Sequence, residues 1–234
     1  MTPTQLPHWD LTNVYPSLES EEFKAAFASL KDYLSVSDQR ISALEALDAS
    51  ASPAVLAEKL NAALDGWNHL QVIGGTISSY IHSFVSTDSF NQEAKRKESE
   101  FDQLGVEFSK LGTRLNRWVG SIAAVLPQVT ALTGTAHEHA FFLNELAEQS
   151  RYLMSQPEEE LAAELSLNGS VAWSKLQGTV TSQLTWEIEL DGEIQRLPMS
   201  AITNLRSHPD EAVRRRGYEV ELKAWEQVKE PLAA

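Results

Sequence analysis

Three successive stretches of the chain repeat apolar residues at alternating steps of three and four, which is the spacing of one helix face. The stretches are Phe23, Phe27, Leu30, Leu34, Ile41 and Leu44; then Ala57, Leu60, Ala63, Trp67, Leu70, Gly74, Ile77, Ile81 and Phe84; then Ala94, Phe101, Leu104, Phe108, Leu111, Leu115, Trp118, Ile122 and Val125. A period near 3.5 predicts long helices that pack nearly antiparallel, each about 40–50 Å long. We therefore expect residues 1–126 to form a long-helix bundle that can project as an arm.

Local signals mark where these helices begin and end. Ser52-Pro53 is typical of a helix cap followed by proline in the first turn, and Pro127 is expected to end the third helix. Gly74-Gly75 lies on the seam of the second helix, where it indicates close helix packing in preference to a bend. The lead segment 1–19 carries Trp9, Leu11, Val14, Tyr15 and Leu18, and we expect it to pack on a helix.

The stretch Ala136–Leu176 predicts two acidic helices that meet at Ser155-Gln156-Pro157. Ser155 followed three residues later by Glu158 is a capping box, and the acidic first turn suits the helix dipole. A break is expected at Asn168-Gly169-Ser170, followed by a buried Trp173.

Residues 179–198 change to a period of two, which is typical of β-strands. Asp191-Gly192 separates two alternating runs and predicts a hairpin turn. A short helix at 200–206 and a last helix capped by Ser207–Asp210 follow. The predicted fold is therefore all-α: a bundle at 1–126 and a second helical subdomain at 127–234 with one small β-hairpin near 180–198.

Composition limits the classes of function. The net charge of −14 disfavours binding to nucleic acid or to anionic membranes, because both need clustered Lys and Arg. The absence of cysteine excludes disulfides, thiolate zinc sites and a cysteine nucleophile. Neither a secretory signal nor a transmembrane run is present in the sequence. We expect a soluble, cytoplasmic protein.

His137-Glu138-His139 resembles part of a metal site. A zinc peptidase helix needs HExxH, whose histidines lie on one face, but Phe141 occupies the second histidine position here. Residues two apart on a helix point about 200° apart, so His137 and His139 cannot chelate one ion. His139 is expected to pack with Phe142, Leu143, Leu146 and Leu153. A helical protein that binds metal through His137 and His139 is a weaker alternative.

Other chemistry is not visible in the sequence. There is no G-x-S-x-G nucleophile motif, and Gly74-Gly75 lacks the residues of a phosphate loop. Arg214-Arg215-Arg216 is interpreted as a solvated helix face that pairs with Glu211 and Glu219. We expect no catalytic, metal-binding or cofactor-binding residue in this chain.

Four segments together resemble the N-terminal lobe of oligoendopeptidase F-type zinc metallopeptidases, of the thimet oligopeptidase-like clan. They are HWDLTNVYPSLESEEFKAAFASLK, HAFFLNELAEQSRYLMSQPEEELAAELSLNGSVAWSKLQ, LTWEIELDGEIQRLPMSAI and SHPDEAVRRRGYEVELKAW. The resemblance covers essentially all of this chain but less than half of a family member. That family is mostly helical, has a channel between two lobes and cleaves short peptides, with zinc on an HExxH helix in its C-terminal half.

The resemblance implies that the chain is one part of a cytoplasmic zinc endopeptidase. It would form one wall of the substrate channel, and its partners would be the missing catalytic lobe and oligopeptide substrates. Alone it would be inactive, because it lacks HExxH, and its uncovered apolar surface could cause self-association. The alternative is a stand-alone helical interaction module with no enzyme activity.

Overall fold

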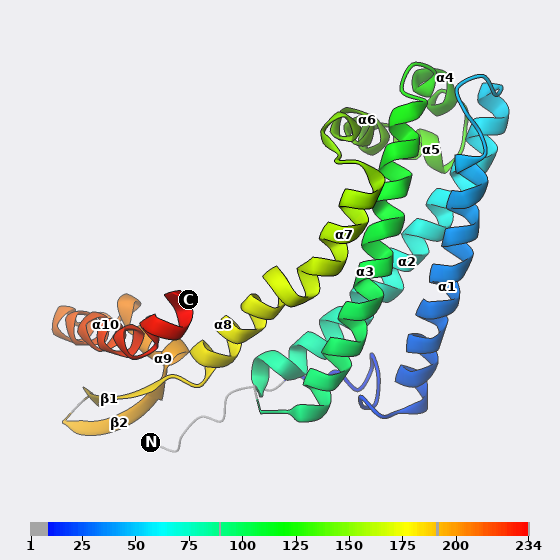
Figure 1. Ribbon diagram of the computed structural model, residues 1–234. Coiled ribbons are helices and arrows are strands. Elements are labelled where there is room, and N and C mark those ends of the chain that lie inside the picture. Colours follow the sequence, from blue (N-terminus) through cyan, green and yellow to red (C-terminus); the bar gives the residue numbers. More distant parts are fainter. Residues whose placement is uncertain (1–8, 89, 191, 234) are drawn as a thin grey trace. The chain divides into compact units, whose positions relative to one another are not determined.

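The computed structural model describes residues 9–88, 90–190 and 192–233, and the chain forms two compact units, residues 1–167 and 168–234 (Figure 1). In the first unit, the described residues form helices joined by turns and irregular segments, without a strand. The second contains helices and one two-stranded antiparallel sheet. The prediction of an all-α fold with one small β-hairpin is therefore confirmed.

Three long helices build the first unit, and they run up, down and up in Figure 1: α1 (Glu21–Glu45), α2 (Pro53–Thr87) and α3 (Gln92–Ser121). Each begins at a capping side chain. Ser20, Ser52 and Asn91 accept hydrogen bonds from the backbone N–H three residues on, at 3.2, 3.4 and 2.9 Å. The predicted cap at Ser52-Pro53 is confirmed.

The core of this unit is made by the apolar series that predicted the helices. Leu44, Leu60, Leu70, Ile77 and Leu115 are among its largest fully buried side chains. Burial of this kind drives folding at about 25 cal/mol per Å² of apolar surface. The three-and-four spacing therefore identified the inward face of all three helices.

The lead segment is anchored at Leu11, Tyr15 and Leu18, as expected, whereas Val14 is 40% exposed. Leu18 is buried, and the Tyr80 hydroxyl donates a hydrogen bond to the Tyr15 carbonyl at 2.8 Å. The rings of Tyr15 and Tyr80 meet edge to face with centroids 5.0 Å apart. Trp9, in contrast, is 91% exposed. The expectation for residues 1–8 lies outside the described residues.

Short helices follow α3 in the first unit: α4 (Leu126–Thr130), α5 (Thr135–Glu138), α6 (Ala140–Gln149) and α7 (Gln156–Ser166), with a 3₁₀ turn at Ser150–Tyr152. The third helix ends at Ser121, before the predicted end. Pro127 lies in the first turn of α4, because proline fits a helix start, so part of the expected connection is helical. The sequence placed a division after residue 126, whereas the first compact unit includes α4 to α7.

Gly74 and Gly75 do not mark a tight helix contact. A Cβ on Gly74 would lie 3.8 Å from Leu30 Cδ1, an ordinary contact, and a Cβ on Gly75 would have nothing within 4 Å. Close packing was therefore the wrong interpretation for Gly75, since open space borders it. The helix α2 runs through both glycines without interruption.

The second unit begins at a kink. Gly169 has the non-helical φ and ψ of −96° and −110° within the turn Leu167–Val171, as the Asn168-Gly169-Ser170 signal predicted. Then follow α8 (Ala172–Ser182), β1 (Thr185–Leu190), β2 (Glu193–Pro198), α9 (Met199–Asn204), a 3₁₀ turn (Leu205–Ser207) and α10 (Glu211–Ala233).

The predicted β-hairpin is present. Leu190 pairs with Glu193 and Thr185 with Pro198, and Gly192 has a φ of +83°, which glycine adopts without strain. Leu184, Met199 and Ala224 form a small core against which Trp186 and Trp225 pack. The described residues contain no helix that is long and apolar enough to cross a membrane.

Candidate functional site

His137 and His139 lie at a junction between two helices and not within one helix. The helix α5 ends at Glu138, His139 has φ and ψ of −98° and 19°, and α6 begins at Ala140. The expectation of a continuous helix here was wrong, since Gly134 starts a short separate turn. The angle of about 200° that a continuous helix would set between the two side chains therefore does not apply here.

The two histidines bind different protein groups. His137 Nδ1 donates to the Thr130 carbonyl at 2.7 Å, and Asn68 Nδ2 lies 3.0 Å from His139 Nε2. The His139 ring also contacts Phe142 edge to face, with centroids 6.4 Å apart. Each ring is thus fixed by its own neighbours. The described residues contain no group of three or more His, Asp or Glu side chains placed to hold a metal ion.

A row of polar residues on α2 holds this junction. The Asn61 amide oxygen accepts a hydrogen bond from Ala136 N–H at 2.7 Å, and Thr135 Oγ1 donates to Asp65 at 2.5 Å. With Asn68, the spacing is four and three, which puts all three on one helix face. Sequence reasoning missed this row, although the same spacing that revealed the apolar faces could have found it.

Gly134 allows the junction to approach α2 closely. Its φ is +142°, and a Cβ there would lie 2.4 Å from Asn61 Nδ2. No side chain can be placed at that separation, so glycine is required both for the backbone conformation and for the contact with Asn61. The arrangement is that of a structural clamp between α2 and α5.

The acidic run that starts α7 is used for capping. The Ser155 backbone N–H and hydroxyl donate to one Glu158 oxygen at 2.9 and 2.6 Å, and these bonds lower the pKa of Glu158, the hydroxyl contributing most. Glu159 accepts from Met154 N–H at 3.0 Å. The predicted capping box is confirmed, and these carboxylates serve the helix start.

The helix α3 contacts the part of the chain around Ser150, Met154 and Glu164. Arg117 donates to the Met154 carbonyl at 2.9 Å, and Lys110 Nζ lies 2.9 Å from Glu164. A Cβ on Gly120 would lie 2.0 Å from Ser150 Oγ, so glycine permits close approach of α3 to the 3₁₀ turn. These contacts orient α6 and α7 against α3.

Several apolar side chains of the same stretch remain exposed. In the first unit, Phe141 and Tyr152 are each 80% exposed, and Leu161 and Leu165 of α7 are also open to solvent. In the second unit, Trp173 is 52% exposed. The expectation that Trp173 is buried was wrong, because α8 has no fully buried residue.

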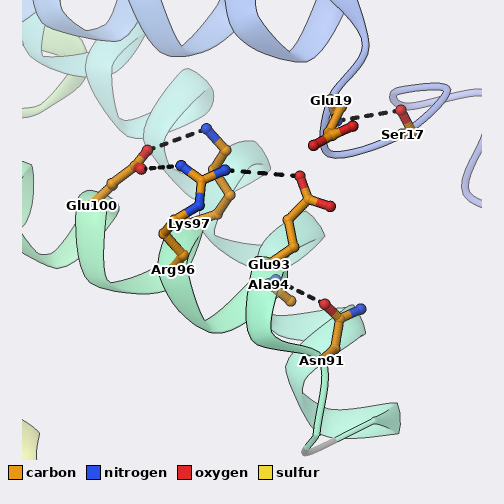
Figure 2. Close-up of polar contacts among 8 residues, drawn as sticks. All are labelled: Ser17, Glu19, Asn91, Glu93, Ala94, Arg96, Lys97 and Glu100. Atoms are coloured by element: carbon orange, nitrogen blue, oxygen red, sulfur yellow. Dashed lines mark hydrogen bonds and ion pairs between the residues drawn. The ribbon is translucent and has the colours of Figure 1, made fainter.

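A second group of titratable residues lies at the start of α3 (Figure 2). The carboxyl groups of Glu19 and Glu93 face each other, while Arg96 pairs with Glu100 at 2.6 Å. Burial raises the pKa of Glu93, and the adjacent Glu19 acts in the same direction through hydrogen bonding and repulsion, while Arg96 and Lys97 oppose the shift. Glu93 is thus the carboxyl of this group that is costly to ionise.

The arginine run on α10 has mixed roles. Arg215 pairs with Glu219 at 3.3 Å, as expected. Arg214 instead donates to the carbonyls of His208 and Pro209 at 2.7 and 2.9 Å, so it stabilises the start of α10.

Comparison with known families identifies one segment. Residues 133–186, which run from α5 into β1, match the model of the oligopeptidase F family, in its N-terminal region. The match covers less than a quarter of the chain and includes the second of the four segments noted in the sequence. The resemblance to an oligoendopeptidase F-type N-terminal lobe is thus confirmed through this stretch. Comparison with curated proteins and with solved structures gives no match.

Proposed function

We propose that this chain is the non-catalytic N-terminal lobe of a zinc-dependent, cytoplasmic oligoendopeptidase that hydrolyses short peptides. The observation that carries the proposal is the family match over residues 133–186. In this account zinc and the HExxH helix belong to a separate catalytic lobe. The chain itself contributes no metal ligand, forms one wall of the substrate channel and limits access to short, unstructured peptides.

The structure supports a scaffolding role for the matched segment. Its histidines bind Thr130 and Asn68, and Glu158 and Glu159 accept hydrogen bonds at the start of α7, so these polar groups hold the fold. The apolar side chains Phe141, Leu161 and Leu165 are exposed on the same segment. Exposed apolar surface of this kind suits contact with another protein part.

The second candidate is a stand-alone helical interaction module, and the same exposed residues favour it. The two functions differ in the coding sequence expected after Ala234. Sequencing the gene beyond that codon separates them: an open reading frame that encodes HExxH supports the peptidase lobe, and an immediate stop codon supports the module. In both cases a partner would cover the exposed face of α7, whereas in its absence the chain would tend to self-associate.

A further inference from the structure

A pocket of about 240 Å³ lies between the three long helices of the first unit. Leu30 and Leu34 of α1 form one wall, and Phe101, Leu104 and Phe108 of α3 form another. On the α2 side, the pocket is bordered by Gly74 and Gly75. We call it the three-helix pocket. It lies outside residues 133–186, and the function proposed above makes no use of it.

Glycines keep this pocket open. A Cβ built on Gly75 or on Gly105 would have no neighbour within 4 Å, so a larger side chain at either position would extend into free space. Glycine inside a helix lowers stability relative to alanine. The sequence therefore retains the open volume despite a cost to the stability of α2 and α3, the helices that carry these glycines.

The lining is apolar and uncharged. Its polar side chains are Gln71 and Ser78, and neither forms a side-chain hydrogen bond with a described residue. The Phe108 ring stacks on Trp67 with centroids 4.5 Å apart and an angle of 21°, which fixes this part of the wall. A bound group would thus meet fixed apolar surfaces together with the solvent-exposed Gln71 amide and the half-buried Ser78 hydroxyl.

Two of the three cationic side chains on the other side of Leu34 and Leu104 are already paired with carboxylates. A neighbouring groove shares these two leucines and contains Lys110 and Arg114. Lys110 Nζ lies 2.9 Å from Glu164, and Arg114 Nε donates to Glu45 at 2.9 Å. A ligand with an anionic group would find Lys110 and Arg114 occupied, while Lys31, the third cation of that groove, is exposed and lies 5.8 Å from the centroid of the Phe27 ring. Burying an anionic charge in the three-helix pocket without a partner is unfavourable.

We propose that the three-helix pocket binds a neutral apolar group of about the size of a substituted benzene ring. The size of the ligand is inferred from the pocket volume: a cavity of about 150 Å³ lined by Leu, Ile and Phe binds benzene, and this pocket is larger. The absence of charge on the ligand is inferred from the uncharged lining. Gln71 and Ser78 can hydrogen-bond one polar substituent on such a group.

Toluene, benzoate and benzylammonium test the proposal, because they share a ring and differ in charge. The methyl groups of Leu30, Leu34, Leu70 and Leu104 are followed by NMR in the full chain. We expect saturable shifts with toluene and at least tenfold weaker binding of both charged probes. Absence of saturation with toluene, or equal binding of the three probes, overturns the proposal.

Matched variants locate the binding. Gly105→Leu fills the pocket and is expected to weaken toluene binding at least tenfold, whereas Gly178→Leu makes the same change on α8, where a Cβ also has nothing within 4 Å, and should leave binding unchanged. Gly75→Leu provides a second filling variant if thermal unfolding shows that Gly105→Leu is not folded. Unchanged affinity in a folded filling variant overturns the proposal. Methyl shifts that depend on protein concentration without toluene also overturn it, since they indicate a side chain from a second copy.

Discussion

The amide oxygen of Asn61 accepts a hydrogen bond from the backbone N–H of Ala136 at 2.7 Å and so joins α2 to the first turn of α5. Ala136 is 1% exposed, so water cannot replace this acceptor without a rearrangement. The bond explains why the His137-Glu138-His139 sequence forms a fixed junction between two short helices.

Replacement of Asn61 tests this clamp. We expect Asn61→Ala to lower the free energy of unfolding by about 1–3 kcal/mol, because a buried N–H loses its partner. Asn144→Ala is the matched control, since Asn144 is exposed and its side chain donates to the Ala140 carbonyl of its own helix, at 2.8 Å. Urea denaturation measures both. Equal, small losses for the two variants would contradict the clamp.

Zinc analysis tests the remaining metal hypothesis. We expect the purified chain, after equilibration with zinc and dialysis, to hold much less than one equivalent, because His137 and His139 bind separate protein groups. His139→Gln should give the same zinc content as the unchanged chain. Stoichiometric zinc that is lost in His139→Gln would show that the two histidines rearrange to form a site.

The Glu93 carboxyl predicts a specific pH dependence. The pKa of Glu93 is raised in the folded chain above the ordinary value of 4.5, chiefly by burial. The folded state therefore favours the protonated carboxyl, and the stability that this preference contributes is present below pH 4.5 and is lost as pH rises through the folded pKa. Glu93→Gln removes the charge and should raise the melting temperature at pH 7 by roughly 1–2 °C, with little change at pH 4.

Glu22→Gln is the control for that measurement, because Glu22 is exposed on α1 and the same change removes one negative charge. Thermal unfolding of both variants at pH 4 and pH 7 gives the comparison. A stabilisation by Glu93→Gln that is the same at both pH values, or that Glu22→Gln reproduces, would mean that the carboxyl pair is not its cause.

In the second unit, a buried carboxylate pairs with an arginine whose side chain is 59% exposed. Glu221 is 6% exposed and accepts a hydrogen bond from Arg206 Nε at 2.9 Å and a second from Arg206 Nη2. Arg206→Met leaves the carboxylate without its main partner and should cost about 1–3 kcal/mol. Arg215→Met breaks only the exposed pair with Glu219 and should change stability by less than about 1 kcal/mol. Guanidinium denaturation measures the free energy of unfolding of both variants. Equal decreases for Arg206→Met and Arg215→Met would contradict a special role for the pair with Glu221.

The long helices could be predicted from the sequence because their burial repeats locally. Leu30, Leu60 and Leu115 lie on seams of period 3.5, and Ser20, Ser52 and Asn91 provide caps within three residues. Gly192 similarly specified the hairpin through its own backbone conformation. In these places the information needed was contained within one turn of the chain.

Features that depend on distant residues were not predictable in this way. The Asn61–Ala136 bond joins positions 75 residues apart, and the exposure of Trp173 depends on how few other elements cover α8. The three-helix pocket likewise depends on Phe101 and Leu104, which lie on a different helix from Gly75. Periodicity identifies a helix face, but it does not show whether another element fills the space beside it.

The proposed lobe function is tested most directly by peptide hydrolysis. The 234-residue chain and the product of its complete reading frame are each assayed with a quenched fluorescent oligopeptide, with and without a zinc chelator. We predict turnover by the complete product alone, and its loss on chelation. Chelator-sensitive turnover by the 234-residue chain, or inactivity of a zinc-loaded complete product, would contradict the account.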